Sequence, residues 1–191
     1  MSTRAPAMRA EERRAAIIAA TLPLLLERGT NISTRQIAET AGIAEGTIFS
    51  VFPDKDAVVQ AVVDAALDPE PTERELAAID PALPYEERLI EAVTIMQRRA
   101  HRIWPLMASV GKSHAHGTAP ADFAALRQIV AAGHARLRTD PATAARQLRA
   151  VTLAVSNPVL FSGDPMTARE IVTVFLHGIL ADRRPDGGDG R

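Results

Sequence analysis

Cysteine is absent from the 191 residues of the chain, and only 4% of the residues are aromatic. Without cysteine the chain can form neither a disulfide framework nor a thiolate metal site, which is compatible with a reducing cytoplasm. Alanine and leucine are plentiful while β-branched runs are short, which favours helices packed on helices over a sheet. With 47% hydrophobic and 24% charged residues, the sequence predicts a soluble, all-α protein of one or two domains.

Signals for membrane insertion and for catalysis are missing as well. The apolar stretch 15–26 follows Arg13-Arg14 but also Glu11-Glu12, has no small-residue cleavage site and is too short to span a bilayer. The sequence contains no glycine-rich phosphate loop, no nucleophile elbow and no HExxH motif. The adjacent Glu86 and Glu87 stand at a predicted helix start, where carboxylates complement the helix dipole. We therefore expect a cytoplasmic protein that is not an enzyme, has no catalytic residues, binds no cofactor and does not enter a membrane.

A helix-turn-helix pattern lies within residues 33–52. Ser33 and Gln36 form a capping box, in which each side chain can accept the backbone N–H of the other residue, so a helix begins here. Gly42 stands where the end of that helix needs a residue at positive φ, and a second helix follows from about Glu45. In proteins with this motif the second helix enters the major groove of DNA.

The order and spacing of residues around this motif resemble those of the tetracycline-repressor (TetR) family of bacterial transcription regulators. The resemblance covers roughly residues 9–64 and is carried by Glu27-Arg28-Gly29, Ser33, Ile37-Ala38, Ala41-Gly42-Ile43, Gly46-Thr47-Ile48 and Phe52-Pro53-Asp54-Lys55-Asp56-Ala57. Two packing helices of an unrelated bundle are the alternative, which so specific a string of residues disfavours. Four positions depart from the family pattern. Ala44 replaces a capping serine, Phe49 a phosphate-binding tyrosine, Val51 a histidine or tyrosine, and Thr30 an aromatic residue.

The resemblance implies an all-α fold in which an N-terminal three-helix DNA-binding domain joins a C-terminal helical bundle for ligand binding and dimerisation. The predicted DNA-binding residues are Ser33, Thr34, Arg35, Glu45, Gly46, Thr47, Phe49, Ser50 and Lys55. The formal net charge of −1 indicates that binding rests on a few placed arginines and helix N-termini, because the chain has no large positive field.

Proline positions and helical periodicity divide the chain into four parts. We expect the DNA-binding domain at residues 9–56, a connecting helix and proline-rich linker at 57–84, the ligand-binding and dimerisation domain at 85–182, and a disordered tail at 183–191.

The sequence also predicts the boundaries of several helices in these parts and the buried side of the first one. The first helix should pack on the motif through the apolar side that carries Ile18, Leu22, Leu25 and Leu26. A long helix is expected at 85–110, with a kink caused by Pro105, and another helix at 121–138. The Asp-Pro pairs at 140–141 and 164–165 predict the starts of the last two helices.

A ligand pocket is expected beside the Pro105 kink, where adaptable methionines gather. The predicted ligand-binding residues are Met96, Arg99, Ile103, Trp104, Met107, Phe123, Leu126 and Val130. Ordinary core packing explains the methionines and the tryptophan equally well, and a solvated helix face is the simpler explanation of the basic run 98–102. The pair His114 and His116 has no third ligand nearby, so we expect a polar loop there and no metal site.

The last two helices contain the runs 151–155 and 171–180, which are apolar on nearly every side and need cover from a second chain. We therefore expect a homodimer whose interface contains Leu148, Val151, Val155, Ile171, Val174, Phe175 and Gly178. The family resemblance implies that two helices from each subunit form a four-helix bundle.

These expectations combine into a ligand-responsive, sequence-specific transcriptional regulator. Its simplest form is a repressor that a small hydrophobic effector releases from a near-palindromic operator, with Arg99 available for an anionic group on that effector. The alternative is a helical small-molecule binding or interaction protein that has lost operator binding. Only the departures at Ala44 and Phe49 favour this alternative.

Overall fold

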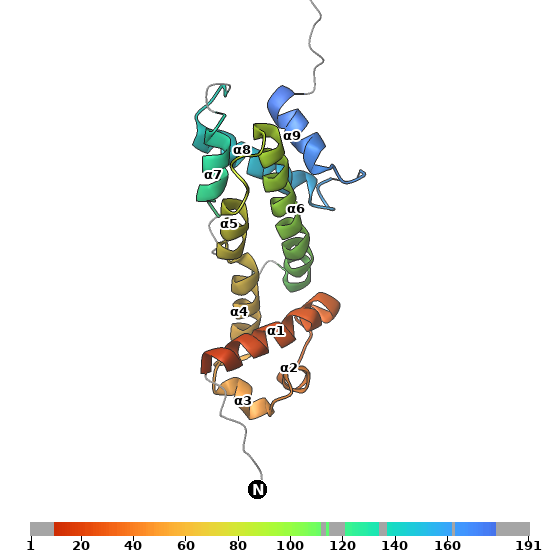
Figure 1. Cartoon of the computed structure of the whole chain (residues 1–191). Helices are drawn as coiled ribbons and strands as arrows, with labels where there is room; N and C mark the ends of the chain where they lie inside the picture. Colours follow the sequence, from red (N-terminus) through yellow and green to blue (C-terminus); the bar gives the residue numbers. More distant parts are fainter. Residues whose placement is uncertain (1–9, 112–113, 115–120, 134–136, 162, 179–191) are drawn as a thin grey trace, which may run out of the picture. The chain divides into compact units, whose positions relative to one another are not determined.

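The computed structural model describes residues 10–111, 114, 121–133, 137–161 and 163–178, and all regular secondary structure in these residues is helical (Figure 1). The all-α prediction is confirmed. The chain divides into two compact units, the first formed by residues 1–71 and 99–121 and the second by residues 72–98 and 122–191. The predicted tail at 183–191 and His116 lie outside the described residues.

The first unit is built around the helix-turn-helix. Its helices are α1 (Ala10–Arg28), α2 (Thr34–Ala41), α3 (Glu45–Phe49), α4 (Lys55–Leu67) and, from Arg99 onwards, α6 (Tyr85–Val110). Side chains from all of these helices and from the turn after α3 share one core, which includes Ile17, Leu25, Ile37, Ile48, Phe52, Val58, Val62, Leu106 and Val110. Because α2 and α3 both contribute to this core, their relative orientation is fixed by packing as well as by the turn between them.

Capping groups set the ends of α2 and α4 as the sequence predicts. In the capping box, the Ser33 N–H donates to Gln36 Oε1 at 2.8 Å and the Gln36 N–H donates to Ser33 Oγ at 3.2 Å. Gly42 ends α2 with a φ of 66°, in the left-handed region. The Asp54 carboxylate accepts the Ala57 N–H at 2.8 Å and begins α4.

The buried side of α1 matches the predicted one in part, since Leu25 is buried and Ile18 packs against the core. Ile17, Thr21 and Leu25 face the core, whereas Leu22 and Leu26 are 36% and 47% exposed. The buried residues are spaced four apart and therefore lie on one side of the helix. Thr21 is accommodated among apolar neighbours because its hydroxyl donates to the Ile17 carbonyl at 2.7 Å. Apolar residues alone therefore do not define the buried side of this helix, because Thr21 belongs to it.

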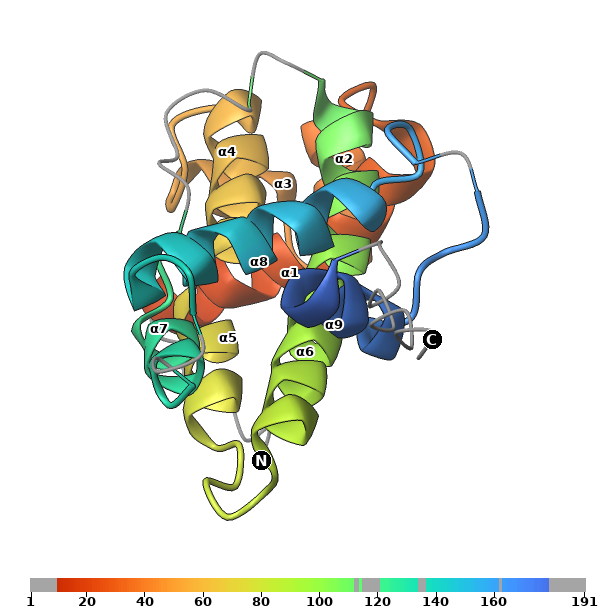
Figure 2. The ribbon, with the colours of Figure 1, turned by 90° about the horizontal axis from the view of Figure 1, so that it is seen from above.

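The second unit contains α5 (Glu70–Ala77) from Thr72 onwards, the first half of α6, α7 (Ala124–Ala131), α8 (Pro141–Val155) and α9 (Ala168–His177). Helix α8 packs beside both α7 and α9 (Figure 2). The buried side chains of this unit include Leu76, Leu89, Val93, Met96, Leu126, Val130, Leu148 and Ile171. The Gln97 amide also donates to the Met166 carbonyl at 2.8 Å, which ties α6 to the segment before α9.

Predicted helix boundaries in the second unit are partly right. Helix α6 has the expected ends, and α8 begins at the predicted Asp140-Pro141 pair. The prediction that a helix begins at 164–165 is wrong, because Thr167 and Glu170 form a reciprocal capping box and α9 starts at Ala168.

Helix α7 is also shorter than the expected 121–138, since it covers only Ala124–Ala131. Shortly after its end, a Cβ atom added to Gly133 would lie 2.3 Å from the Tyr85 ring, so only glycine permits this close approach.

Candidate nucleic-acid interface

Helix α3 is five residues long and has no side-chain cap, because Ala44 occupies its N-cap position. Two other contacts hold it in place. Ile48 is completely buried in the core, and the Thr34 hydroxyl at the start of α2 donates to the Glu45 carboxylate at the start of α3. Helix α3 is therefore positioned by the core and by α2 more than by its own first turn.

The side of α3 opposite Ile48 faces away from the core and carries predicted DNA-binding residues. At helical spacing on this outer side lie the exposed Glu45, Gly46, Phe49 and Ser50. Of the other predicted DNA-binding residues, Ser33 and Arg35 are exposed and Thr34, Thr47 and Lys55 are half-buried. All nine belong to the first unit.

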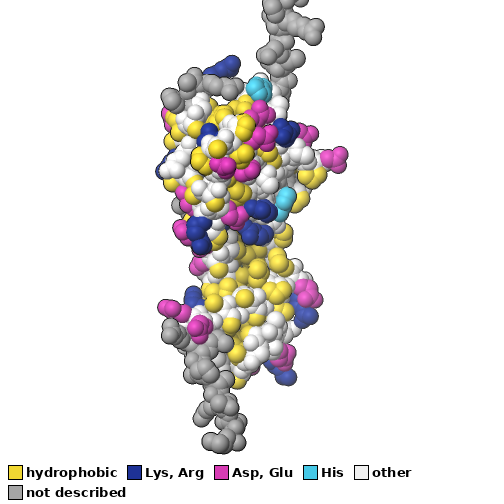
Figure 3. All heavy atoms as spheres, in the orientation of Figure 1, with side chains coloured by type: hydrophobic (Ala, Val, Ile, Leu, Met, Phe, Trp, Pro, Cys, Tyr) yellow, Lys and Arg dark blue, Asp and Glu magenta, His cyan; other side chains and the backbone are white. Residues whose placement is uncertain are grey.

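Two carboxylates, those of Glu39 and Glu45, influence Arg35. Its Nε donates to Glu39 Oε1 at 3.0 Å, and this hydrogen bond raises the pKa of Arg35 above its ordinary value. The Glu45 carboxylate adds a smaller electrostatic effect in the same direction. Where Figure 3 shows charged side chains, acidic and basic ones lie close together. A DNA phosphate would have to compete with Glu39 for Arg35, which limits affinity for DNA in general.

Lys55 already has a structural partner at the start of α4. Its Nζ donates to the Thr30 carbonyl at 3.0 Å and so ties α4 to the connection between α1 and α2. An ammonium group has three hydrogens, so this bond leaves two for a phosphate. The Arg14 guanidinium lies 4.4 Å from the centroid of the Phe52 ring and adds a second tie, between α1 and the turn before α4.

The predicted ligand-binding residues are divided between the two units. The second unit contains Met96, Phe123, Leu126 and Val130, all buried, and the first contains Arg99, Ile103, Trp104 and Met107. Arg99 donates from Nη2 to the Leu67 carbonyl at 2.6 Å and from Nη1 to the Asp68 carbonyl at 2.7 Å. Burial lowers the pKa of Arg99, and the neighbouring Arg102 adds to this effect. Arg99 therefore caps the C-terminal end of α4, where a cation also complements the helix dipole.

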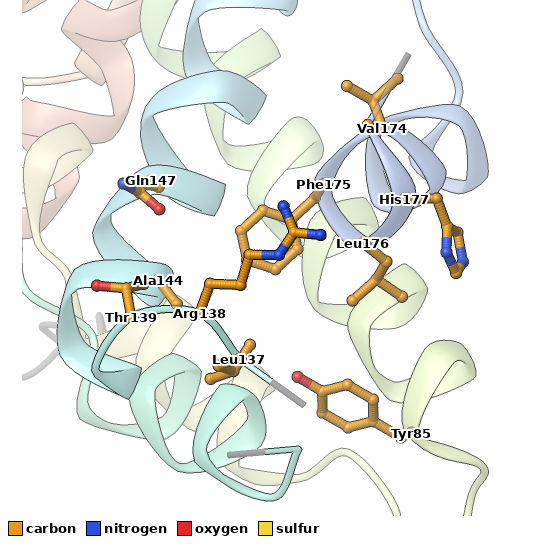
Figure 4. A pocket seen from close by; sticks show the side chains of 11 residues that line it. Tyr85, Leu137, Arg138, Thr139, Ala144, Gln147, Val174, Phe175, Leu176 and His177 are labelled. Atoms are coloured by element: carbon orange, nitrogen blue, oxygen red, sulfur yellow. The ribbon is translucent and has the colours of Figure 1, made fainter. Parts of the chain in front are cut away.

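A cavity of about 330 Å³ lies within the second unit, and none of the predicted ligand-binding residues lines it. Its walls come from the start of α6, the α7–α8 connection, α8 and α9 (Figure 4), and consist of Tyr85, Leu137, Arg138, Thr139, Ala144, Gln147, Val174, Phe175, Leu176, His177 and Gly178. Tyr85 is a fixed part of the wall, because its hydroxyl donates to the Val130 carbonyl at 3.1 Å. Polar side chains (Tyr85, Arg138, Thr139, Gln147 and His177) and apolar ones share these walls, so the cavity suits a small molecule with both polar and apolar groups.

The sequence analysis missed this cavity because four separate segments form it. The chain's single tyrosine at the start of a long helix is the one local signal that could have drawn attention to it.

The predicted dimer-interface residues differ in how far their own chain already covers them. Leu148 and Ile171 are completely buried within the second unit, whereas Val151 on α8 is 37% exposed. Of the others, Val155, Val174 and Phe175 are half-buried and Gly178 is exposed. In the connection between α8 and α9, the large apolar side chains of Val159 and Leu160 are strongly exposed. Among the described residues of the second unit, the exposed large apolar side chains therefore lie on α8 and in this connection.

The described residues contain neither a metal-binding cluster nor a membrane-spanning helix. Among the described residues, no cluster of three or more histidine, cysteine, aspartate or glutamate residues could hold a metal ion. Within the same part of the chain, no helix has both the length and the hydropathy needed to cross a membrane.

A helix-turn-helix with an exposed second helix, followed by a second helical unit, is the architecture of a helical DNA-binding regulator. Residues 17–62 match the family model described as bacterial regulatory proteins, tetR family. This match confirms the resemblance to the TetR family found in the sequence, and it covers the helix-turn-helix and the start of α4. No curated protein matches the sequence.

Solved structures of TetR-like fold resemble most of the chain. NalD from Pseudomonas aeruginosa, the secondary repressor of the MexAB-OprM multidrug efflux pump, is 26% identical with a TM-score of 0.56, and the match covers 92% of this chain and 99% of NalD. The fatty acid degradation regulator FadR from Bacillus halodurans is 16% identical with a TM-score of 0.63, covering 93% and 98%. FadR from Bacillus subtilis, solved with stearoyl-CoA, is 15% identical with a TM-score of 0.61, covering 87% and 99%.

Proposed function

We propose that the protein is a sequence-specific transcriptional repressor whose α3 enters the major groove of a near-palindromic operator. The observation that carries the proposal is the exposed outer side of α3, anchored by the buried Ile48 within the stretch that matches the TetR family. Thr47 and Ser50 contact base edges or nearby phosphates, and Arg35 approaches from α2. Lys55 and the N-terminus of α4 bind a phosphate.

A mobility-shift assay on the DNA upstream of the protein's own gene tests this proposal. Ser50→Asp places a carboxylate on the outer side of α3 and should abolish the shift by repelling phosphates. Thr94→Asp in the second unit is the matched control, because both hydroxyls are exposed and each donates to a nearby helix carbonyl. The Ser50 hydroxyl donates to the Thr47 carbonyl and the Thr94 hydroxyl to the Ile90 carbonyl. The control variant should bind as the unchanged protein does. Equal binding by both variants, or no binding by the unchanged protein to any duplex, would overturn the proposal.

We further propose that the protein acts as a homodimer through its last two helices. The support is the exposed apolar surface at Val151, Val159 and Leu160, which a second copy would cover. A two-fold dimer presents two copies of α3, which explains why the operator should be near-palindromic.

A small, mainly hydrophobic effector completes the proposed function. The indole N–H of Trp104 is buried and has no hydrogen-bond partner among the described residues, so a ligand carbonyl or carboxylate would remove a desolvation cost there. The cavity beside Tyr85 lies within the volume range of known ligand sites. FadR from Bacillus subtilis, which has a similar fold, was solved with stearoyl-CoA, and the long acyl chain of that molecule supports a hydrophobic effector.

A second candidate function is small-molecule binding or protein interaction without operator binding. The missing side-chain cap of α3 at Ala44 favours it, because a less stable α3 would dock on DNA less well. The same mobility-shift assay separates the two functions.

A further inference from the structure

Phe49 is a large aromatic side chain that the first unit leaves in water. It is 52% exposed, although the ring of Phe52 in the same segment is buried. Phe49 lies on the outer side of α3, one turn after Glu45 and next to Ser50. An exposed apolar side chain on the helix proposed to enter the groove indicates a contact outside the chain.

Gly46 lies on the same side of α3, and neither the backbone conformation nor the packing of the chain requires glycine at this position. Its backbone does not have a positive φ, and a Cβ atom added to it would meet no heavy atom within 4 Å. Glycine is a poor helix former, and α3 is short and uncapped, so alanine would suit the isolated fold better. The missing side chain therefore leaves room for close approach of another molecule beside Phe49.

We propose that Phe49 packs against the 5-methyl group of a thymine in each half-site, so that the protein reads this base through an apolar contact. This inference rests on the proposed function. Phenylalanine has no donor or acceptor for a phosphate or a base edge, and the thymine methyl is the apolar group that bases present in the major groove. Close approach at Gly46 brings the ring within reach of that methyl.

Glu45 supports contact with bases over contact with the DNA backbone. Its carboxylate lies one turn before Phe49 on the same side of α3, and phosphates would repel it. A base edge that presents an amino group, such as cytosine N4, can instead donate to it. The two neighbouring side chains therefore both suit the floor of the groove.

The test replaces thymines of the bound operator with deoxyuridine, which keeps base pairing and removes only the 5-methyl group. At one symmetric position, the unchanged protein should lose about 4-fold in affinity per half-site, and about 15-fold when both half-sites are changed, as expected for one buried methyl group each. Phe49→Ala should bind the normal operator more weakly and should show no further loss with deoxyuridine. Phe49→Leu should keep part of the effect.

Leu26→Ala is the matched control, because Leu26 is an apolar side chain of similar exposure on α1. It should keep the full deoxyuridine effect, and thermal unfolding of all variants shows whether any loss of binding comes from unfolding. An operator that tolerates deoxyuridine at every thymine would overturn the inference while leaving the proposed function intact. An equal loss of affinity with deoxyuridine in the unchanged protein and in Phe49→Ala would also overturn the inference. Failure of the unchanged protein to bind any duplex would instead overturn the proposed function.

Discussion

The ammonium group of Lys55 at the start of α4 joins a contact within the chain to a proposed contact with DNA. Lys55 Nζ donates to the Thr30 carbonyl at 3.0 Å, and we assign a DNA phosphate to its remaining hydrogens. Lys55→Ala should therefore weaken binding to all DNA sequences alike and lower the slope of log affinity against log salt by about 1, because one phosphate contact is lost. Titrations at several salt concentrations, on the operator and on an unrelated duplex, measure both effects. Weaker binding with an unchanged slope would show that Lys55 acts only through Thr30.

The carboxylate of Asp140 makes the stability of α8 depend on pH with a defined sign. It accepts the Thr143 N–H at 2.9 Å, and this hydrogen bond lowers the pKa of Asp140 below its ordinary value. A carboxyl whose folded pKa is depressed adds stability above its unfolded pKa of about 4, and this stability is lost as the pH falls through the folded pKa.

The variant Asp140→Asn tests this pH dependence, since it keeps a capping oxygen but cannot ionise. The thermal midpoint of the unchanged protein should fall more steeply than that of the variant between about pH 5 and about pH 2. The two proteins differ in one titrating group, so the difference between their profiles belongs to Asp140. Parallel profiles would contradict the assignment.

Helix ends in this chain are set by short-range chemistry, which is why the sequence predicts most of them. The capping residues Ser33, Gly42, Asp54 and Asp140 each act within about one turn of their helix, and the structure places all four as expected. The start of α9 is the exception. Two helix-start signals lie there within seven residues, and the helix begins at the reciprocal capping box of Thr167 and Glu170 and not at the preceding Asp-Pro pair.

Buried sides and cavities depend on segments that are distant in the sequence, and these were predicted less well. The core side of α1 includes Thr21, whose hydroxyl donates to a carbonyl of its own helix, so apolar periodicity alone identified only Ile18 and Leu25 of this side. Nothing near Arg99 in the sequence indicates that it would cap the carbonyls of Leu67 and Asp68 on α4. The cavity beside Tyr85 likewise exists only after four segments have packed.

Helix α3 lacks a side-chain cap, and this defect can be repaired. Ala44 has the extended backbone of an N-cap residue, with φ −71° and ψ 142°, and only a side-chain acceptor is missing. Ala44→Thr adds that acceptor, whereas the isosteric Ala44→Val adds the same bulk without it. The threonine variant should exceed the valine variant in free energy of unfolding by about 1 kcal/mol. Urea unfolding measures the difference, and equal stabilities would contradict a capping role at this position.

At the scale of the whole molecule, the proposed dimer depends on the outer side of α8. Val151→Glu should give monomers, because a charge that is harmless on the open surface is costly in a closed apolar interface. Val151 tests the interface better than Phe175 does, because Phe175 lines the cavity of its own chain and its substitution would also disturb that cavity. Leu22→Glu on α1 is the control, since the exposures of Leu22 and Val151 are 36% and 37%. Light scattering after gel filtration should show dimers for the unchanged protein and for Leu22→Glu. A monodisperse monomer of the unchanged protein at micromolar concentration would contradict the dimer.

Effector binding should reduce operator affinity by changing the spacing of the two α3 helices in the dimer. Half-sites lie about one helical turn apart, roughly 34 Å, so only one spacing fits both of them. A ligand shifts the balance between two spacings only as far as its affinities for them differ. A coupling free energy of about 1 to 3 kcal/mol corresponds to a 5- to 150-fold loss of operator affinity.

Fluorescence of Trp104, the chain's single tryptophan, can follow effector binding directly. In a screen of hydrophobic metabolites and drugs, a true effector should change Trp104 emission and release DNA over the same concentration range.

Two variants then locate the site. Trp104→Phe keeps an aromatic side chain but replaces the indole with a smaller phenyl ring and removes the unpaired N–H, so it should weaken a ligand bound there, with DNA release as the readout. Arg138→Gln should weaken a ligand bound in the cavity beside Tyr85, most strongly when the ligand carries a carboxylate. A ligand that changes the emission and leaves operator binding intact would contradict the coupling, because binding would then not favour either spacing of α3.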